Sequence, residues 1–82
     1  MDLQALIILA EMLDKARMQA NSIADTESEQ GVYGEVKRAL TSTLEIICYN
    51  SGHHPTLGYR VYESMSMNGD TVRQALEAEG IV

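Results

Sequence analysis

Residues 3 to 23 of this chain read LQALIILAEMLDKARMQANSI, and this stretch decides the fold. Its apolar residues recur at spacings of three and four, which is the period of an α-helix that buries one side. One such stripe comprises Leu6, Leu9, Leu13, Ala16, Ala20 and Ile23. The sequence therefore predicts one long helix from Asp2 to about Ala24, with this stripe turned toward a second helix.

The first turns of this helix are apolar on nearly every side. Beyond the stripe they carry Leu3, Ile7, Ile8 and Met12. A helix that is apolar all round must be covered all round, and small helical hairpins commonly achieve this by packing against another copy. We therefore expect a homo-oligomer with these four residues at its interface. The alternative is a monomer whose C-terminal segments cover every apolar side.

A polar cluster then leads into a second long helix. Thr26 and Glu29 have the spacing of a capping box, in which each side chain accepts a hydrogen bond from a backbone N–H of the other residue. Gly31 and Gly34 disfavour helix, so we expect regular helix only from about residues 32 to 35, after a connection of up to ten residues. The helix should end near Asn50.

Two short helices are predicted after Pro55. Residues 56 to about 66 fit a helical period, although the alternation from Tyr59 to Met67 would also fit a strand. We favour helix because a lone strand would have no partner. Asp70 is the expected N-cap of a last helix over residues 71 to 79, which Gly80 should end. The prediction is a single all-α domain over residues 1–82: a long helical hairpin followed by two short helices, packed as an oligomeric bundle.

Composition limits the function. The chain has 82 residues, 45% of them hydrophobic and 22% charged, with a formal net charge of -6 and a single cysteine. The mixture is too apolar for a disordered tail, and the lone Cys48 fits a reducing compartment. The apolar run at the N-terminus is too short to span a bilayer and lacks the basic start of a signal peptide. We expect a soluble cytoplasmic protein that does not bind membranes, and the acidic charge disfavours nucleic acid.

Few residues are suited to chemistry. Cys48, His53 and His54 are possible zinc ligands, but neighbouring histidines diverge and a fourth ligand is missing nearby. Cys48 also lies at the C-terminal end of its helix, where the helix dipole raises the pKa of a thiol and so opposes nucleophilic catalysis. We predict no catalytic residue, no metal, no cofactor and no enzymatic activity.

Tyrosines suggest a binding surface. The chain has four Tyr and neither Phe nor Trp, so every aromatic ring carries a polar hydroxyl. We predict a partner- or ligand-binding patch formed by His53, His54, Tyr59, Arg60 and Tyr62. Two alternatives are rings that merely edge a small core, and rings that stack a nucleotide base while Arg60 binds phosphate.

The predicted function is that of a small acidic interaction or regulatory protein that binds a protein partner as a homo-oligomer. An inhibitor or accessory protein encoded by a phage or mobile element is one form of this function. A first alternative is a binder of a nucleotide-like small molecule, with its site at the subunit interface. A second is a DNA-binding regulator that uses the last two helices, although their glutamates oppose it.

Overall fold

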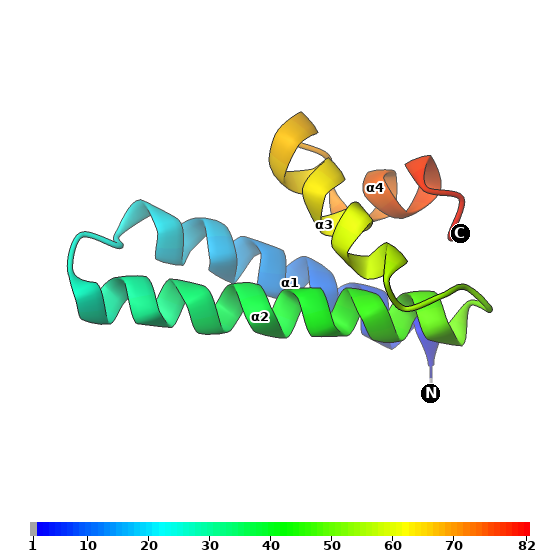
Figure 1. Cartoon of the computed structure of the whole chain (residues 1–82), viewed down its shortest axis with the longest axis horizontal. Helices are drawn as coiled ribbons and strands as arrows, with labels where there is room; N and C mark the ends of the chain where they lie inside the picture. The colour runs from blue at the N-terminus through cyan, green and yellow to red at the C-terminus, as the bar shows by residue number, and fades with distance from the viewer. Residues whose placement is uncertain (1) are drawn as a thin grey trace.

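A computed structural model describes residues 2–82. Two long antiparallel helices form a hairpin, and two short helices lie over one half of it (Figure 1). The helices are α1 (Leu3–Ser22), α2 (Glu27–Asn50), α3 (Leu57–Asn68) and α4 (Val72–Ala78). The predicted all-α hairpin with two short C-terminal helices is confirmed, and the segment after Pro55 is a helix instead of a strand.

The start of α2 differs from the prediction. The capping box is present: the Glu29 amide donates to Thr26 Oγ1 at 3.1 Å, and the Thr26 amide donates to Glu29 Oε1 at 3.0 Å. The helix begins at Glu27, so Gly31 and Gly34 lie within it and the expected long connection is wrong. The cap and the two glutamates at the positive end of the helix dipole offset the cost of two glycines, about 1 kcal/mol each.

The start of α4 is also shifted. Its N-cap is Thr71, whose Oγ1 accepts from the Gln74 amide at 3.2 Å while the Gln74 side chain accepts from the Thr71 amide at 2.9 Å. The predicted N-cap, Asp70, instead accepts a hydrogen bond from Ser64 Oγ at 3.0 Å. Its carboxylate therefore ties the turn to α3 and does not cap α4.

The end of α4 is as predicted. Gly80 has φ +72°, a left-handed conformation that favours glycine. It allows the Ile81 amide to donate to the Leu76 carbonyl at 2.8 Å and the Ile81 side chain to return to the core, where it is 6% exposed. This is the Schellman arrangement of a helix C-terminus.

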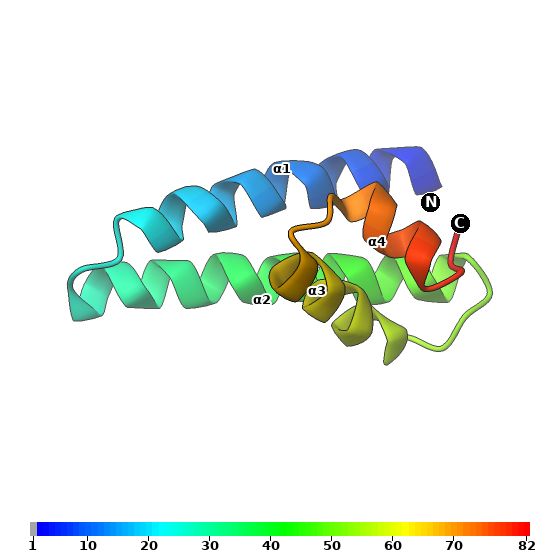
Figure 2. The same ribbon diagram turned by 90° about the horizontal axis from the view of Figure 1, so that it is seen from above.

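The hydrophobic core lies between one half of the hairpin and the two short helices. Seen from above, α3 and α4 cover the half that contains the start of α1 and the end of α2, whereas the hairpin tip extends beyond them (Figure 2). The core residues are Leu6, Ile7, Ala10, Leu40, Leu44, Ile47, Cys48, Val61, Tyr62, Met65, Val72, Ala75, Leu76 and Ile81.

The inward face of α1 is rotated from the predicted stripe. Ile7, Ala10 and Asp14 are buried, whereas Leu9 and Ile23 are 44% and 56% exposed. The predicted stripe is the side of α1 that would be buried by α2 alone. Because α1 packs against both α2 and α4, its buried arc is centred between these two neighbours.

Candidate functional site

The five residues predicted to form a binding patch differ in exposure, so they do not all belong to one exposed surface. Tyr62 is 6% exposed and belongs to the core, whereas Tyr59 on the same helix is 57% exposed. Arg60 lines a different surface, between α3 and the end of α4. His54 Nδ1 accepts a hydrogen bond from the Thr56 amide at 3.2 Å and lies 2.8 Å from Thr56 Oγ1, so its ring supports the turn before α3. Exposed His54 and half-buried His53 therefore belong to a loop.

Tyr62 forms part of a cluster that joins three helices. The Arg17 guanidinium carbon of α1 lies 5.5 Å from the centroid of its ring, and Lys37 Nζ of α2 lies 5.4 Å from it. Both distances are in the range of cation–π attraction. Burial, reinforced by the neighbouring Tyr33, raises the pKa of Tyr62 above its ordinary 10.0 despite the nearby Arg17. Tyr62 thus holds the hairpin to α3.

Asp14 completes this cluster from the same helix as Arg17. Asp14 Oδ1 accepts hydrogen bonds from Arg17 Nη2 at 2.8 Å and from Arg17 Nε at 3.1 Å, and both side chains are 12% exposed. Burial alone would lower the pKa of Arg17, but the hydrogen bonds and charge of Asp14, together with Tyr62 and Tyr33, outweigh burial and raise that pKa. This pair is not among the residues predicted to form a site. The spacing of Asp14 from Ile7 and Ala10, which places it on the same face of α1, is the signal in the sequence that points to its burial.

The surface has shallow depressions next to this cluster. One of about 280 Å³ lies between α1 and the turn from α3 to α4, and one of about 150 Å³ adjoins it. Asp14, Met18 and Thr71 line both. A third, of about 270 Å³, lies beside Arg60. Small-molecule sites usually enclose about 300 to 1,000 Å³, so each depression is below that range.

The candidate chemical groups are placed as follows. The Cys48 side chain is fully buried, and burial, together with the charge of Glu45, raises its pKa above the ordinary 9.0. A thiol in this state is a poor nucleophile. Within residues 2–82, His, Cys, Asp and Glu side chains form no group of three or more that could hold a metal ion. In the same part of the chain, each helix is too short or too polar to cross a bilayer.

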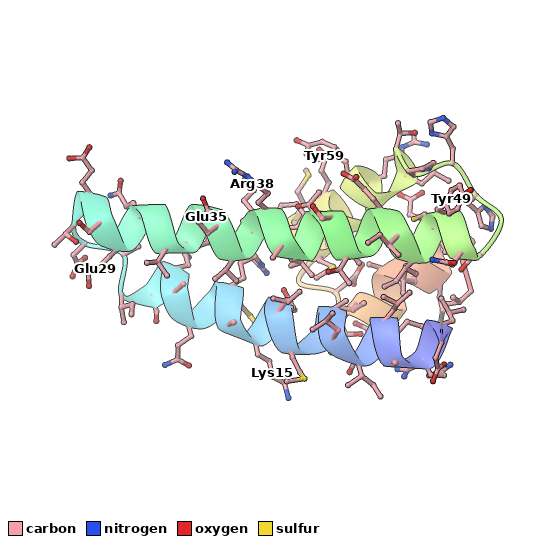
Figure 3. The ribbon with its side chains drawn as sticks, turned by 90° about the horizontal axis from the view of Figure 1, so that it is seen from below. Lys15, Glu29, Glu35, Arg38, Tyr49 and Tyr59 are labelled. Carbon is pink, nitrogen blue, oxygen red and sulfur yellow. The ribbon has the colours of Figure 1, made fainter. Side chains whose placement is uncertain are left out.

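Six of the large hydrophobic residues that are exposed lie on the side of the hairpin away from α3 and α4, which we call the underside. Figure 3 views the molecule from this side, with α1 and α2 in front. Helical spacing places ten exposed residues here: Ala5, Ile8, Leu9, Met12, Ala16, Gln19 and Ile23 from the first segment and Val32, Ala39 and Ile46 from α2. None of these ten is charged. By the same spacing, exposed Glu35 and Ser42 lie on this face of α2 between Val32, Ala39 and Ile46, and Lys15, labelled in Figure 3, borders the surface.

The large side chains of the underside are substantially exposed. Ile8, Leu9, Met12, Ile23, Val32 and Ile46 are 42 to 63% exposed. Of the four predicted interface residues, Ile8 and Met12 belong to this surface. Ile7 is buried in the core of its own chain and Leu3 packs half-buried against that core, so neither needs a second copy to cover it.

Comparison of the chain with protein-family models, with curated proteins and with solved structures gives no match.

Proposed function

We propose that this chain is a small non-enzymatic interaction or regulatory protein, which acts through a protein-binding surface as a homo-oligomer. The observation that carries the proposal is the underside. Contiguous apolar patches larger than a few hundred Å² are rare on proteins that act as monomers, and they mark sites of interaction. Here the patch extends along both helices of the hairpin, and the chain's own short helices cover the opposite side.

The position of the core supports this assignment. All core residues of α2 lie at or after Leu40, and those of α3 and α4 pack above that half of the hairpin. Beyond it, α1 and α2 have each other as neighbours and little else. In a two-helix hairpin each helix buries one stripe against the other and leaves its remaining apolar side chains in water. A protein bound to these side chains would remove their apolar area from water, which is favourable by about 25 cal/mol per Å².

The two alternative functions have less support. The nucleotide-like ligand was expected to stack on tyrosine rings beside Arg60, but Tyr62 is buried in the core and the depression that Arg60 lines includes neither Tyr59 nor Tyr62. The DNA regulator required a free basic side chain on α4. Arg73 Nε instead lies 3.4 Å from Glu11 Oε1, and Arg73 Nη2 donates to Gln4 Oε1 at 3.0 Å.

The test is site-specific photocrosslinking in the cells that produce the protein. A benzophenone amino acid replaces Met12 on the underside or, as a control, Met67 on α3, which is 79% exposed. We expect protein adducts from position 12 and few from position 67. A folded protein that yields no adduct from position 12 would refute the proposal, since an interaction surface must be in contact with another protein.

A further inference from the structure

We infer that the underside binds the underside of a second copy of this chain, giving a symmetric dimer in which two hairpins form a four-helix bundle. This inference rests on the proposed function and names the occupant of that surface. The α3 and α4 helices then lie on the two outer sides of the bundle, because they cover the opposite face of each hairpin (Figures 1 and 3).

The area is sufficient for a stable dimer. The α1 helix has 20 residues and α2 has 24. At 1.5 Å per residue and a diameter of about 10 Å for each helix, the face is about 30 Å long and about 20 Å wide. Its projected area is therefore about 600 Å², and the accessible area of such a ridged surface is larger, close to the ~800 Å² per partner of a standard interface.

The pattern of residues fits a copy of itself. Leu9, Ala16 and Ile23 recur every seven residues in the first segment, and Val32, Ala39 and Ile46 recur every seven residues in α2. Knobs-into-holes packing uses two apolar positions in each heptad; these stripes supply one of them, and Ala5 and Met12 supply part of the second in the first segment. Each stripe alternates large side chains with an alanine, so it offers both ridges and spaces. A two-fold dimer needs one self-complementary patch, and this face provides it.

Charge favours a second copy over a lipid surface. The chain carries a net charge of -6, which anionic membranes repel, and helices that lie on membranes are usually bordered by several Lys or Arg residues. Lys15 is the basic residue that borders the underside. The ten residues carry no charge, and Glu35, which lies on the same face of α2, is 3.8 Å from the guanidinium of Arg38, so each copy brings one partly compensated carboxylate to the interface.

The dimer is tested by sedimentation equilibrium on the purified chain. The 9.0 kDa chain should sediment at twice that mass. The Met12→Glu/Val32→Glu variant adds four carboxylates to the interface, two from each copy. These carboxylates would be desolvated without a partner of opposite charge, so the dissociation constant should rise at least about 100-fold. Both side chains are more than half exposed, so the fold should survive, as circular dichroism will show. The control, Met67→Glu, changes an exposed methionine on α3 and should leave the dimer intact.

Each outcome has a defined meaning. A wild-type chain that stays at 9.0 kDa up to roughly 100 µM, or an equal loss of dimer in Met67→Glu, overturns the inference. In the crosslinking experiment, an adduct at position 12 with the mass of two chains supports it. An adduct at position 12 with a different protein alone overturns the dimer but leaves the protein-binding role of the underside standing, whereas the absence of any adduct refutes both. Binding to anionic vesicles by a monomer also overturns the dimer.

Discussion

Gly58 sits where α3 crosses α2 with no room for a side chain. A Cβ at this position would lie 2.6 Å from the Glu45 amide nitrogen and 2.8 Å from Glu45 Cα. These are backbone atoms of a long helix, so they cannot move aside as a flexible side chain would. The glycine is required here for close approach, since its backbone has the ordinary right-handed conformation.

Gly58→Ala should therefore destabilise the fold. Overpacking of this kind costs about 1 to 3 kcal/mol, and separation of α3 from α2 would also loosen Val61 and Tyr62 in the core. Urea unfolding at a fixed protein concentration measures the effect. A variant as stable as the wild type would show that α3 can move away from α2 without cost.

The buried pair of Asp14 and Arg17 has a matched exposed pair in the same molecule. Both pairs are three residues apart on a helix, but the Asp14 and Arg17 side chains are 12% exposed whereas those of Glu35 and Arg38 are 74% and 77% exposed. Removing one charge from a buried pair leaves the other without its partner in a poorly hydrated place, whereas water compensates at the surface.

Asp14→Asn should lower the free energy of unfolding by about 2 kcal/mol, and the matched control Glu35→Gln by less than about 0.5 kcal/mol. Chemical denaturation of both variants provides the comparison. Equal losses in the two variants would mean that the Asp14–Arg17 pair behaves as a solvated surface pair. Without the Asp14 carboxylate, the Arg17 guanidinium should also be held less firmly over the Tyr62 ring.

At the level of elements, α2 is held at its start by a cap instead of by intrinsic propensity. Gly31 and Gly34 are exposed within the helix, and a Cβ at either position would meet no atom within 4 Å. Each glycine therefore only increases the conformational freedom of the unfolded chain. The first turns of α2 are therefore only marginally stable, because none of their residues belongs to the hydrophobic core.

Gly31→Ala and Gly34→Ala should each stabilise the protein by up to about 1 kcal/mol. Thr26→Ala should have the opposite effect, a loss of about 1 kcal/mol, because the Glu29 amide loses its acceptor. The measurements are thermal and urea unfolding. If alanine at these glycine positions destabilised the chain, the helical geometry at residues 27 to 34 would be wrong. The opposite effect of Gly58→Ala on the free energy of unfolding would distinguish a glycine required for close helix packing from glycines that have no such role.

At the scale of the whole molecule, the fold buries two groups that must stay protonated. Burial raises the pKa of Cys48 above 9.0, and burial with the neighbouring Tyr33 raises the pKa of Tyr62 above 10.0. Both groups are neutral when protonated. Their contribution to stability is therefore fully present below the ordinary pKa values and is lost as pH rises through the raised values of the folded state.

Stability should consequently be insensitive to these two groups up to about pH 9 and should fall above it, first through Cys48 and then through Tyr62. Tyr62→Phe should make the fall above pH 10 less steep, because the ring still packs but no longer titrates. The exposed Tyr59→Phe serves as the control. The free energy of unfolding from urea titrations between about pH 7 and pH 11 tests this. An identical slope in the wild type and Tyr62→Phe would contradict it.

The sequence by itself determined the number, order and approximate ends of the helices. These follow from local physics: apolar residues at the helical period, the Thr26 and Glu29 cap, and Gly80 in the left-handed conformation. Short-range errors arose where two local signals competed. Gly31 and Gly34 disfavour helix, but the cap at Thr26 and Glu29 stabilises it there. Asp70 and Thr71 are both residue types that cap helices, and the hydrogen bond from Ser64 to Asp70 leaves Thr71 as the cap.

The tertiary structure decided which side of each helix is available for function. Ile7 and Ile8 are adjacent and equally apolar, yet one is 1% and the other 52% exposed. Tyr59 and Tyr62 differ in the same way. Periodicity shows which residues share one side of a helix. It does not show which side faces another helix, because that depends on how segments distant in the sequence pack. Tyr62 is therefore in the core although it was predicted to belong to the binding patch, and the surplus of apolar residues in the first helix is part of an exposed, mainly apolar surface on both helices of the hairpin.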